Sequence, residues 1–162
     1  MGKKAFIFPG QASQYAGMGK DLYEKFTASR NIFEEANRVL GFSISDICFN
    51  GPVEKLTLTE ITQPAILTVS TAAFAALQQE GESKFDFCAG HSLGEYSALV
   101  AAGSIAFSDA VKIVHKRGKF MQEAVPVGEG AMAAIIGLET GKTIEICKEV
   151  SKSTGIVTPA NF

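Results

Sequence analysis

The stretch Gly90-His91-Ser92-Leu93-Gly94 predicts a sharp bend with a serine at its tip. Residues 85–89 before it form an apolar run that indicates a buried strand. Residues 95–102 after it have a helical pattern, and Gly103 stands where a helix commonly ends. A glycine on each side of Ser92 permits a tight turn and a close approach to a neighbouring strand. We therefore expect strand, turn and helix, with the Ser92 hydroxyl at the positive end of the helix.

A serine in this position is suited to attack an ester or a thioester. The backbone N–H of Leu93 would then bind the oxyanion that forms. Alternatively, Ser92 has no catalytic role and is only a small residue that fits a glycine-rich turn. The predicted strand before it and helix after it favour the catalytic interpretation. A nucleophilic serine needs a base, and the chain has two histidines. The His91 side chain should diverge from that of Ser92, and His115 falls beside a lysine stripe, which predicts a solvated surface histidine.

The composition limits the classes of protein to consider. With 162 residues, 46% of them hydrophobic, the chain can bury the core of one domain. A net charge of −2 does not favour nucleic-acid binding. The apolar run at 5–8 ends at Pro9-Gly10 and is too short for a signal peptide or a membrane span. Three dispersed cysteines and no metal-binding cluster fit a cytoplasmic protein without a metal site.

The pattern before residue 125 alternates strands and helices, which indicates an α/β fold. Thr62 is predicted to cap one helix, Pro64 to lie in its first turn, and Gly81 to end it. Ser108 is predicted to cap another. The expected elements are strands at 5–8 and 85–89 and helices at 20–28, 31–40, 63–79, 95–102 and 109–123.

The pattern changes after that last helix. Residues 125–130 have the composition of a linker. A strand is predicted at 131–138, a helix at 143–151 and a strand at 156–160. This is the beginning of a βαβ-like unit, and we expect the chain to be truncated within it. The predicted domains are therefore residues 1–124 and 125–162.

Arg117 is unusual because it falls among apolar residues on its helix, opposite the lysine stripe. A guanidinium in such a place is costly unless it is paired. Either it forms an ion pair with an acidic side chain, or it binds a substrate carboxylate with two parallel hydrogen bonds. The pattern leaves both open. The loop Gly10-Gln11-Ala12-Ser13-Gln14 follows the first strand, at the edge where a parallel sheet forms its sites, and one of its backbone N–H groups could be a second oxyanion donor. The alternative is a polar loop between a strand and a helix.

Together these motifs resemble the malonyl-CoA:acyl-carrier-protein transacylase family over the whole chain. The resemblance rests on ordered motifs: Phe8-Pro9-Gly10-Gln11-Ala12-Ser13-Gln14, Thr62-Gln63-Pro64-Ala65, Gly90-His91-Ser92-Leu93-Gly94-Glu95-Tyr96-Ser97-Ala98, Arg117-Gly118 with Met121-Gln122, and Gly130-Ala131-Met132-Ala133-Ala134. It implies an α/β-hydrolase-like core, here incomplete, and the first half of an inserted ferredoxin-like subdomain. One departure is mild: Ala12 stands where the family commonly has glycine.

The resemblance also implies roles. Ser92 would form a malonyl ester, Gln11 and Leu93 would supply oxyanion N–H groups, Arg117 would bind the malonyl carboxylate, and Gln63 would line the site. Leu93 also matches the residue typical of malonyl-selective members. The implied substrates and partners are malonyl-CoA and acyl carrier protein, in fatty acid biosynthesis, with no cofactor.

A second departure is large, because the general-base histidine of the family lies downstream of anything in this chain. Two alternatives therefore stay open. One is a serine hydrolase or thioesterase on the same core, with water as the acceptor. The other is a noncatalytic fragment that still binds coenzyme A or a carrier.

Overall fold

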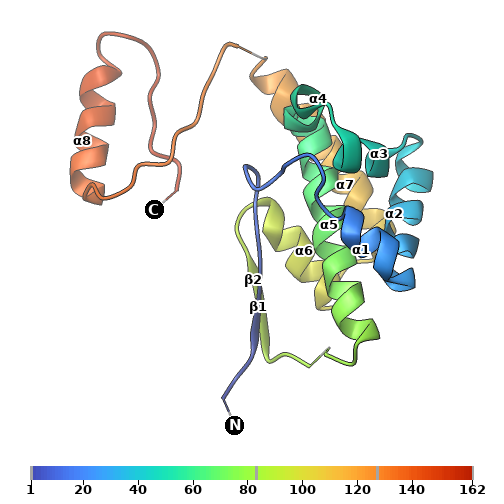
Figure 1. Cartoon of the computed structure of the whole chain (residues 1–162). Coiled ribbons are helices and arrows are strands. Elements are labelled where there is room, and N and C mark those ends of the chain that lie inside the picture. The colour runs from blue at the N-terminus through green and yellow to red at the C-terminus, as the bar shows by residue number, and fades with distance from the viewer. Residues whose placement is uncertain (1, 83, 127, 162) are drawn as a thin grey trace. The chain divides into compact units, whose positions relative to one another are not determined.

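The computed structural model describes residues 2–82, 84–126 and 128–161, and its two strands pair in parallel (Figure 1). Strand β1 (Ala5–Phe8) has its predicted bounds, whereas β2 (Phe87–Gly90) begins two residues later than predicted. At Asp86, just before β2, the side-chain carboxylate accepts the backbone N–H of Lys4 at 2.8 Å, in the place of a backbone carbonyl. The expected mixed α/β fold with a parallel sheet is confirmed. Residues 1–127 and 128–162 form separate units, which are described in turn.

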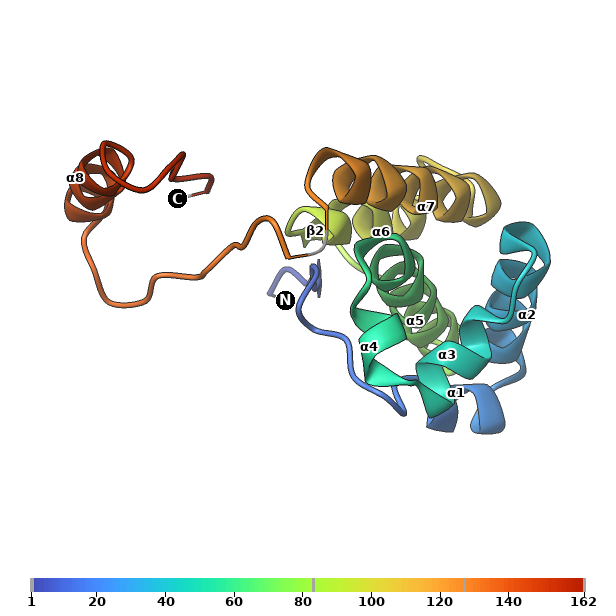
Figure 2. The same ribbon diagram turned by 90° about the horizontal axis from the view of Figure 1, so that it is seen from above.

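In the first unit, helix α5 packs against both α2 and α7, as Figure 2 shows from above. Most of α5 is buried, which explains why its sequence is apolar on nearly every face. The helices of this unit are α1 (Lys20–Lys25), α2 (Thr27–Leu40), α3 (Ile44–Asn50), α4 (Val53–Thr57), α5 (Thr59–Gln79), α6 (Leu93–Ala101) and α7 (Phe107–Ala124).

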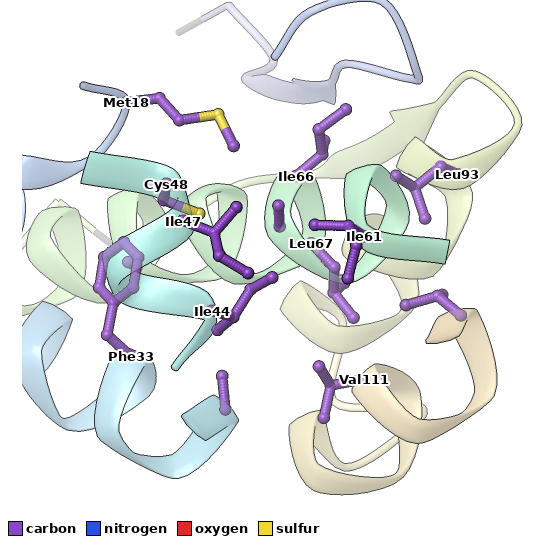
Figure 3. Packing of buried hydrophobic residues seen from close by; sticks show 14 of the residues in the cluster. Met18, Phe33, Ile44, Ile47, Cys48, Ile61, Ile66, Leu67, Leu93 and Val111 are labelled. Carbon is purple, nitrogen blue, oxygen red and sulfur yellow. The ribbon is translucent and has the colours of Figure 1, made fainter. Parts of the chain in front are cut away.

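The main core forms where these helices meet around α5 (Figure 3). Phe33 of α2 and Ile44 of α3 pack on one side of it, and Leu93 of α6 and Val111 of α7 lie on the other. All four side chains are fully buried. A smaller cluster joins the sheet to α5 and α6 through Phe8, Phe74 and Ala98. The core therefore fixes the ends of β2, α5, α6 and α7 relative to one another.

Several predicted helix boundaries are wrong. Helix α5 begins at Thr59 because the Leu58 carbonyl already accepts the N–H groups of Ile61 and Thr62, at 2.8 and 2.7 Å. Thr62 therefore lies inside the helix and does not cap it, and its hydroxyl donates to the Leu56 carbonyl at 2.6 Å. Pro64 accordingly lies in the second turn. At the other end Gly81 has the predicted helix-ending conformation, with φ of 85°.

Helix α7 also begins earlier than predicted. Its N-cap is Ala106, and Ser108 lies within the first turn. The cause is burial of Phe107, which joins the helix to the main core. Helices α3 and α4 were not predicted at all, since each is too short to show a helical period.

The described residues of the second unit form one helix, α8 (Thr140–Val150), which begins three residues earlier than the predicted helix at 143–151 and ends one residue earlier. The strands predicted at 131–138 and 156–160 are wrong: the structure assigns no strand to these described residues. A strand needs a hydrogen-bonded partner. At Val157 that partner is replaced by the Ser151 hydroxyl, which bonds to both its N–H and its carbonyl at 2.9 Å. Among the described helices of the chain, none is long and apolar enough to cross a membrane.

Candidate active site

Ser92 lies at the bend between β2 and α6, which we call the elbow (residues 90–94). It is the N-cap of α6, with φ of 51° and ψ of −105°, a conformation that is strained for a residue with a Cβ. The surrounding glycines make this bend possible. A Cβ on Gly94 would lie 2.8 Å from the Pro9 carbonyl oxygen, and one on Gly90 would lie 2.6 Å from the Glu95 nitrogen. The exposed Ser92 is thus held at the predicted strand–turn–helix junction.

Arg117 of α7 reaches Ser92 from a different part of the chain. Its Nη2 donates to Ser92 Oγ at 3.1 Å, and its Nη1 donates to Gln63 Oε1 at 2.7 Å. The guanidinium carbon lies 6.0 Å from the centre of the Tyr96 ring. Within the described part of the chain, ion pairs join only Lys4 to Glu82, Arg38 to Glu35 and Lys112 to Asp109. Arg117 therefore stands beside Ser92 with its charge unmatched by any described carboxylate.

Gln63 is fully buried in α5 and holds Arg117 in place. The nitrogen of the same Gln63 amide, Nε2, donates to Met121 Sδ at 3.1 Å. The family resemblance implied that Gln63 lines the site, but it implied no role for Met121. The signal that was available is the spacing of Arg117 and Met121, since residues four apart share one face of a helix.

Gly118 sets the distance between these two helices. A Cβ there would lie 2.7 Å from the Thr59 carbonyl oxygen and 2.6 Å from Glu60 Cα. Both atoms belong to the backbone of the first turn of α5. The absence of a side chain at Gly118 thus lets Arg117 come within hydrogen-bonding distance of Gln63.

Of the two predicted oxyanion donors, Leu93 lies within the elbow and Gln11 lies in the loop after β1. Leu93 is the first residue of α6, where a backbone N–H has no partner within the helix, and its side chain is fully buried in the main core. Gln11 is exposed in the loop after β1, and its Nε2 donates to Thr59 Oγ1 at 3.3 Å. This loop approaches the elbow so closely that a Cβ on Gly10 would lie 2.7 Å from the His91 carbonyl oxygen.

Neither histidine contacts the Ser92 hydroxyl, whose hydrogen bond within the described residues comes from Arg117. The prediction that His115 is a solvated surface residue is wrong. Its half-buried ring packs edge-on against Phe42, with ring centres 5.6 Å apart. This burial lowers the pKa of the His115 imidazole, and the Lys119 charge lowers that pKa further. The described residues thus provide a candidate nucleophile and a cation without a carboxylate partner, but no base next to them.

Comparison with known proteins shows the family of the chain. Residues 5–156 match the acyl transferase domain family. The chain belongs to that family. Malonyl CoA-acyl carrier protein transacylase of Bacillus subtilis is 51% identical over 162 residues, and the protein of the same name from Escherichia coli K12 is 49% identical over 158 residues. These alignments cover 100% and 98% of this acyl transferase chain but 51% of each relative.

Solved structures of the family have a similar fold. An acyl-carrier-protein S-malonyltransferase from Burkholderia pseudomallei matches with a TM-score of 0.91 and 46% identity, over 99% of this chain and 52% of that one. A type II PKS acyl-carrier protein in complex with its malonyl-transacylase matches with a TM-score of 0.88 and 47% identity, over 93% and 49%. The chain thus spans about half the length of the curated relatives it matches. The resemblance found in the sequence is confirmed.

Proposed function

We propose that this chain carries the nucleophile and the carboxylate-binding residue of an acyltransferase that moves a malonyl group from coenzyme A to the phosphopantetheine thiol of an acyl carrier protein. The observation that carries the proposal is the Arg117 guanidinium, which lies 3.1 Å from Ser92 Oγ and is held at 2.7 Å by the buried Gln63. Relatives named for malonyl CoA and acyl carrier protein support the choice of substrates.

The reach of Arg117 favours a short acyl group that ends in a carboxylate. In a malonyl ester of Ser92, three single bonds of about 1.5 Å separate Oγ from the carboxylate carbon, so a bent chain spans about 3–4 Å. A guanidinium already in contact with Oγ can therefore grip that carboxylate through two N–H groups. An acetyl group has no carboxylate and would leave the charge of Arg117 unpaired.

The proposed reaction has two steps, formation of a malonyl ester on Ser92 and transfer of the malonyl group to the carrier thiol. Ser92 Oγ attacks the thioester carbonyl and loses its proton to a base. The backbone N–H groups of Leu93 and Gln11 bind the oxyanion of the tetrahedral intermediate. The C–S bond then breaks, and the coenzyme A thiolate takes up a proton. In the second step the carrier thiol attacks the malonyl ester, which returns the proton to Ser92 and releases the loaded carrier.

No described side chain that contacts Ser92 can act as its base. We therefore propose that the general-base histidine of the family, which is neither His91 nor His115, completes the site. The resemblance favours an incomplete α/β-hydrolase-like core at 1–124 and the first half of a ferredoxin-like subdomain at 125–162. The absent base also favours the alternative that the chain as given binds substrate without turning it over.

Mass spectrometry after exposure to malonyl-CoA tests the proposal. We expect one malonyl group on Ser92 and none on the Ser92→Ala variant. Adduct on the variant would overturn the assignment of the nucleophile. Addition of a holo carrier protein should then move the malonyl group to its thiol, whereas release of free malonate would indicate a hydrolase.

A further inference from the structure

We infer that Met121 is a positioning residue for malonyl recognition, because its thioether fixes the orientation of the Gln63 amide that holds Arg117. This inference rests on the proposed function of Arg117. The side chain of Met121 forms no hydrogen bond with Ser92 or Arg117, and it acts through Gln63 alone.

The Gln63 amide is bonded on both sides by one helix. Its oxygen accepts from Arg117 Nη1 at 2.7 Å, and its nitrogen donates to Met121 Sδ at 3.1 Å. Arg117 and Met121 are four residues apart and so lie on the same face of α7. A flipped amide would bring two donors together at Arg117 and two acceptors together at Met121. Only the observed orientation of the amide lets Gln63 form hydrogen bonds with both Arg117 and Met121.

The sulfur matters because Gln63 has no access to solvent. The residue is fully buried in α5, so a free Nε2–H group would lack any compensating bond to water. Met121 itself is 43% exposed, yet its sulfur is engaged with this buried nitrogen. Loss of the acceptor would favour movement of the amide toward another partner, and Arg117 would lose the contact that holds it beside Ser92.

Two substitutions separate this role from simple packing. Met121→Leu keeps an apolar side chain of similar size but has no acceptor, whereas Met121→Gln keeps a similar length and offers an amide oxygen. A packing role predicts that leucine is tolerated better than glutamine. A positioning role predicts the reverse order. Met132→Leu, at a residue 79% exposed in the second unit, is the matched control.

The first measurement is hydrogen exchange of the Gln63 side-chain amide by NMR, which needs no substrate. The second is the ratio of the affinities for malonyl-CoA and acetyl-CoA, measured by calorimetry. We expect Met121→Leu to speed the exchange and to reduce the malonyl preference about tenfold. Met121→Gln should restore both values toward wild type, and Met132→Leu should change neither.

Two results would overturn the positioning role. One is a Met121→Leu variant in which the exchange rate of the Gln63 amide and the malonyl preference both equal those of wild type. The other is a malonyl preference that is smaller in Met121→Gln than in Met121→Leu. If Met121→Leu does not fold, Met121→Gln decides alone, since a lost preference there contradicts the inference. A wild-type chain without any malonyl preference would instead refute the proposed role of Arg117, and the exchange rates would still report on the Gln63 amide.

Discussion

Substitution of Gly118 by alanine should separate α7 from α5. The added Cβ would lie 2.7 Å from the Thr59 carbonyl oxygen, whereas an ordinary contact begins at 3.4 Å, so the helices must move apart by about 0.7 Å. Both close atoms are backbone atoms and cannot rotate away. Overpacking of this kind costs about 1–3 kcal/mol, and we expect the upper end. Alanine in a helix interior returns about 1 kcal/mol, which leaves a net loss of about 2 kcal/mol.

The same displacement should affect the site. The Nη1–Oε1 distance between Arg117 and Gln63 is 2.7 Å, and a further 0.7 Å would bring it to about 3.4 Å, beyond a good hydrogen bond. Hydrogen exchange followed by mass spectrometry can measure the protection of peptides from α5 and α7. Calorimetry with malonyl-CoA and acetyl-CoA can measure the preference on the same variant. We expect Gly118→Ala to lower both.

Gly141 in α8 offers a matched control, because a Cβ there meets no atom within 4 Å. Gly141→Ala should raise or preserve the protection of α8, since alanine has the higher helix propensity. Equal protection of α5 and α7 in wild type and Gly118→Ala would refute the close approach of the two helices. A lowered protection with an unchanged malonyl preference would refute its link to Arg117.

Three further predictions concern stability and reactivity. Ala12 has φ of 83°, so Ala12→Gly should raise the free energy of unfolding by up to about 1 kcal/mol in thermal denaturation, and a lower value would contradict the strain. Burial lowers the pKa of His115, so the unfolded chain binds the proton first, and stability should fall as pH drops below about 6.5; His115→Gln should reduce that dependence. Burial raises the pKa of the Cys48 thiol to about 12, so iodoacetamide at pH 8 should alkylate Cys147 and spare Cys48 in the folded protein.

The elbow could be predicted from the sequence because its determinants are local. Gly90 and Gly94 bracket Ser92, and the strand and helix patterns lie on either side. The position of Arg117 on the apolar side of its helix was also predictable from periodicity alone. Its partner was not, because Gln63 lies on another helix and the two meet only through tertiary packing.

Other features depend on contacts that a linear pattern does not contain. The apolar residues at 131–138 suggested a strand, but a strand also needs a hydrogen-bonded neighbour, and the side chain of Ile136 in that segment is 92% exposed. The half-buried state of His115 depends on Phe42, which is distant in sequence. The bond from Gln63 to the Met121 sulfur has no signature in composition. Local bends were thus predictable, and contacts between helices were not.

The central claim is that Arg117 selects an acyl group with a carboxylate at Ser92. Its most direct test compares malonyl and acetyl adducts on Ser92 in Arg117→Ala, with Lys116→Ala as the control for loss of an exposed charge on the same helix. We predict that Arg117→Ala reduces malonyl loading about 10- to 100-fold, because charge-assisted hydrogen bonds contribute about 1.5–3 kcal/mol, while acetyl loading changes little. An equal loss of malonyl and acetyl loading would contradict the role of Arg117 as the carboxylate-binding residue.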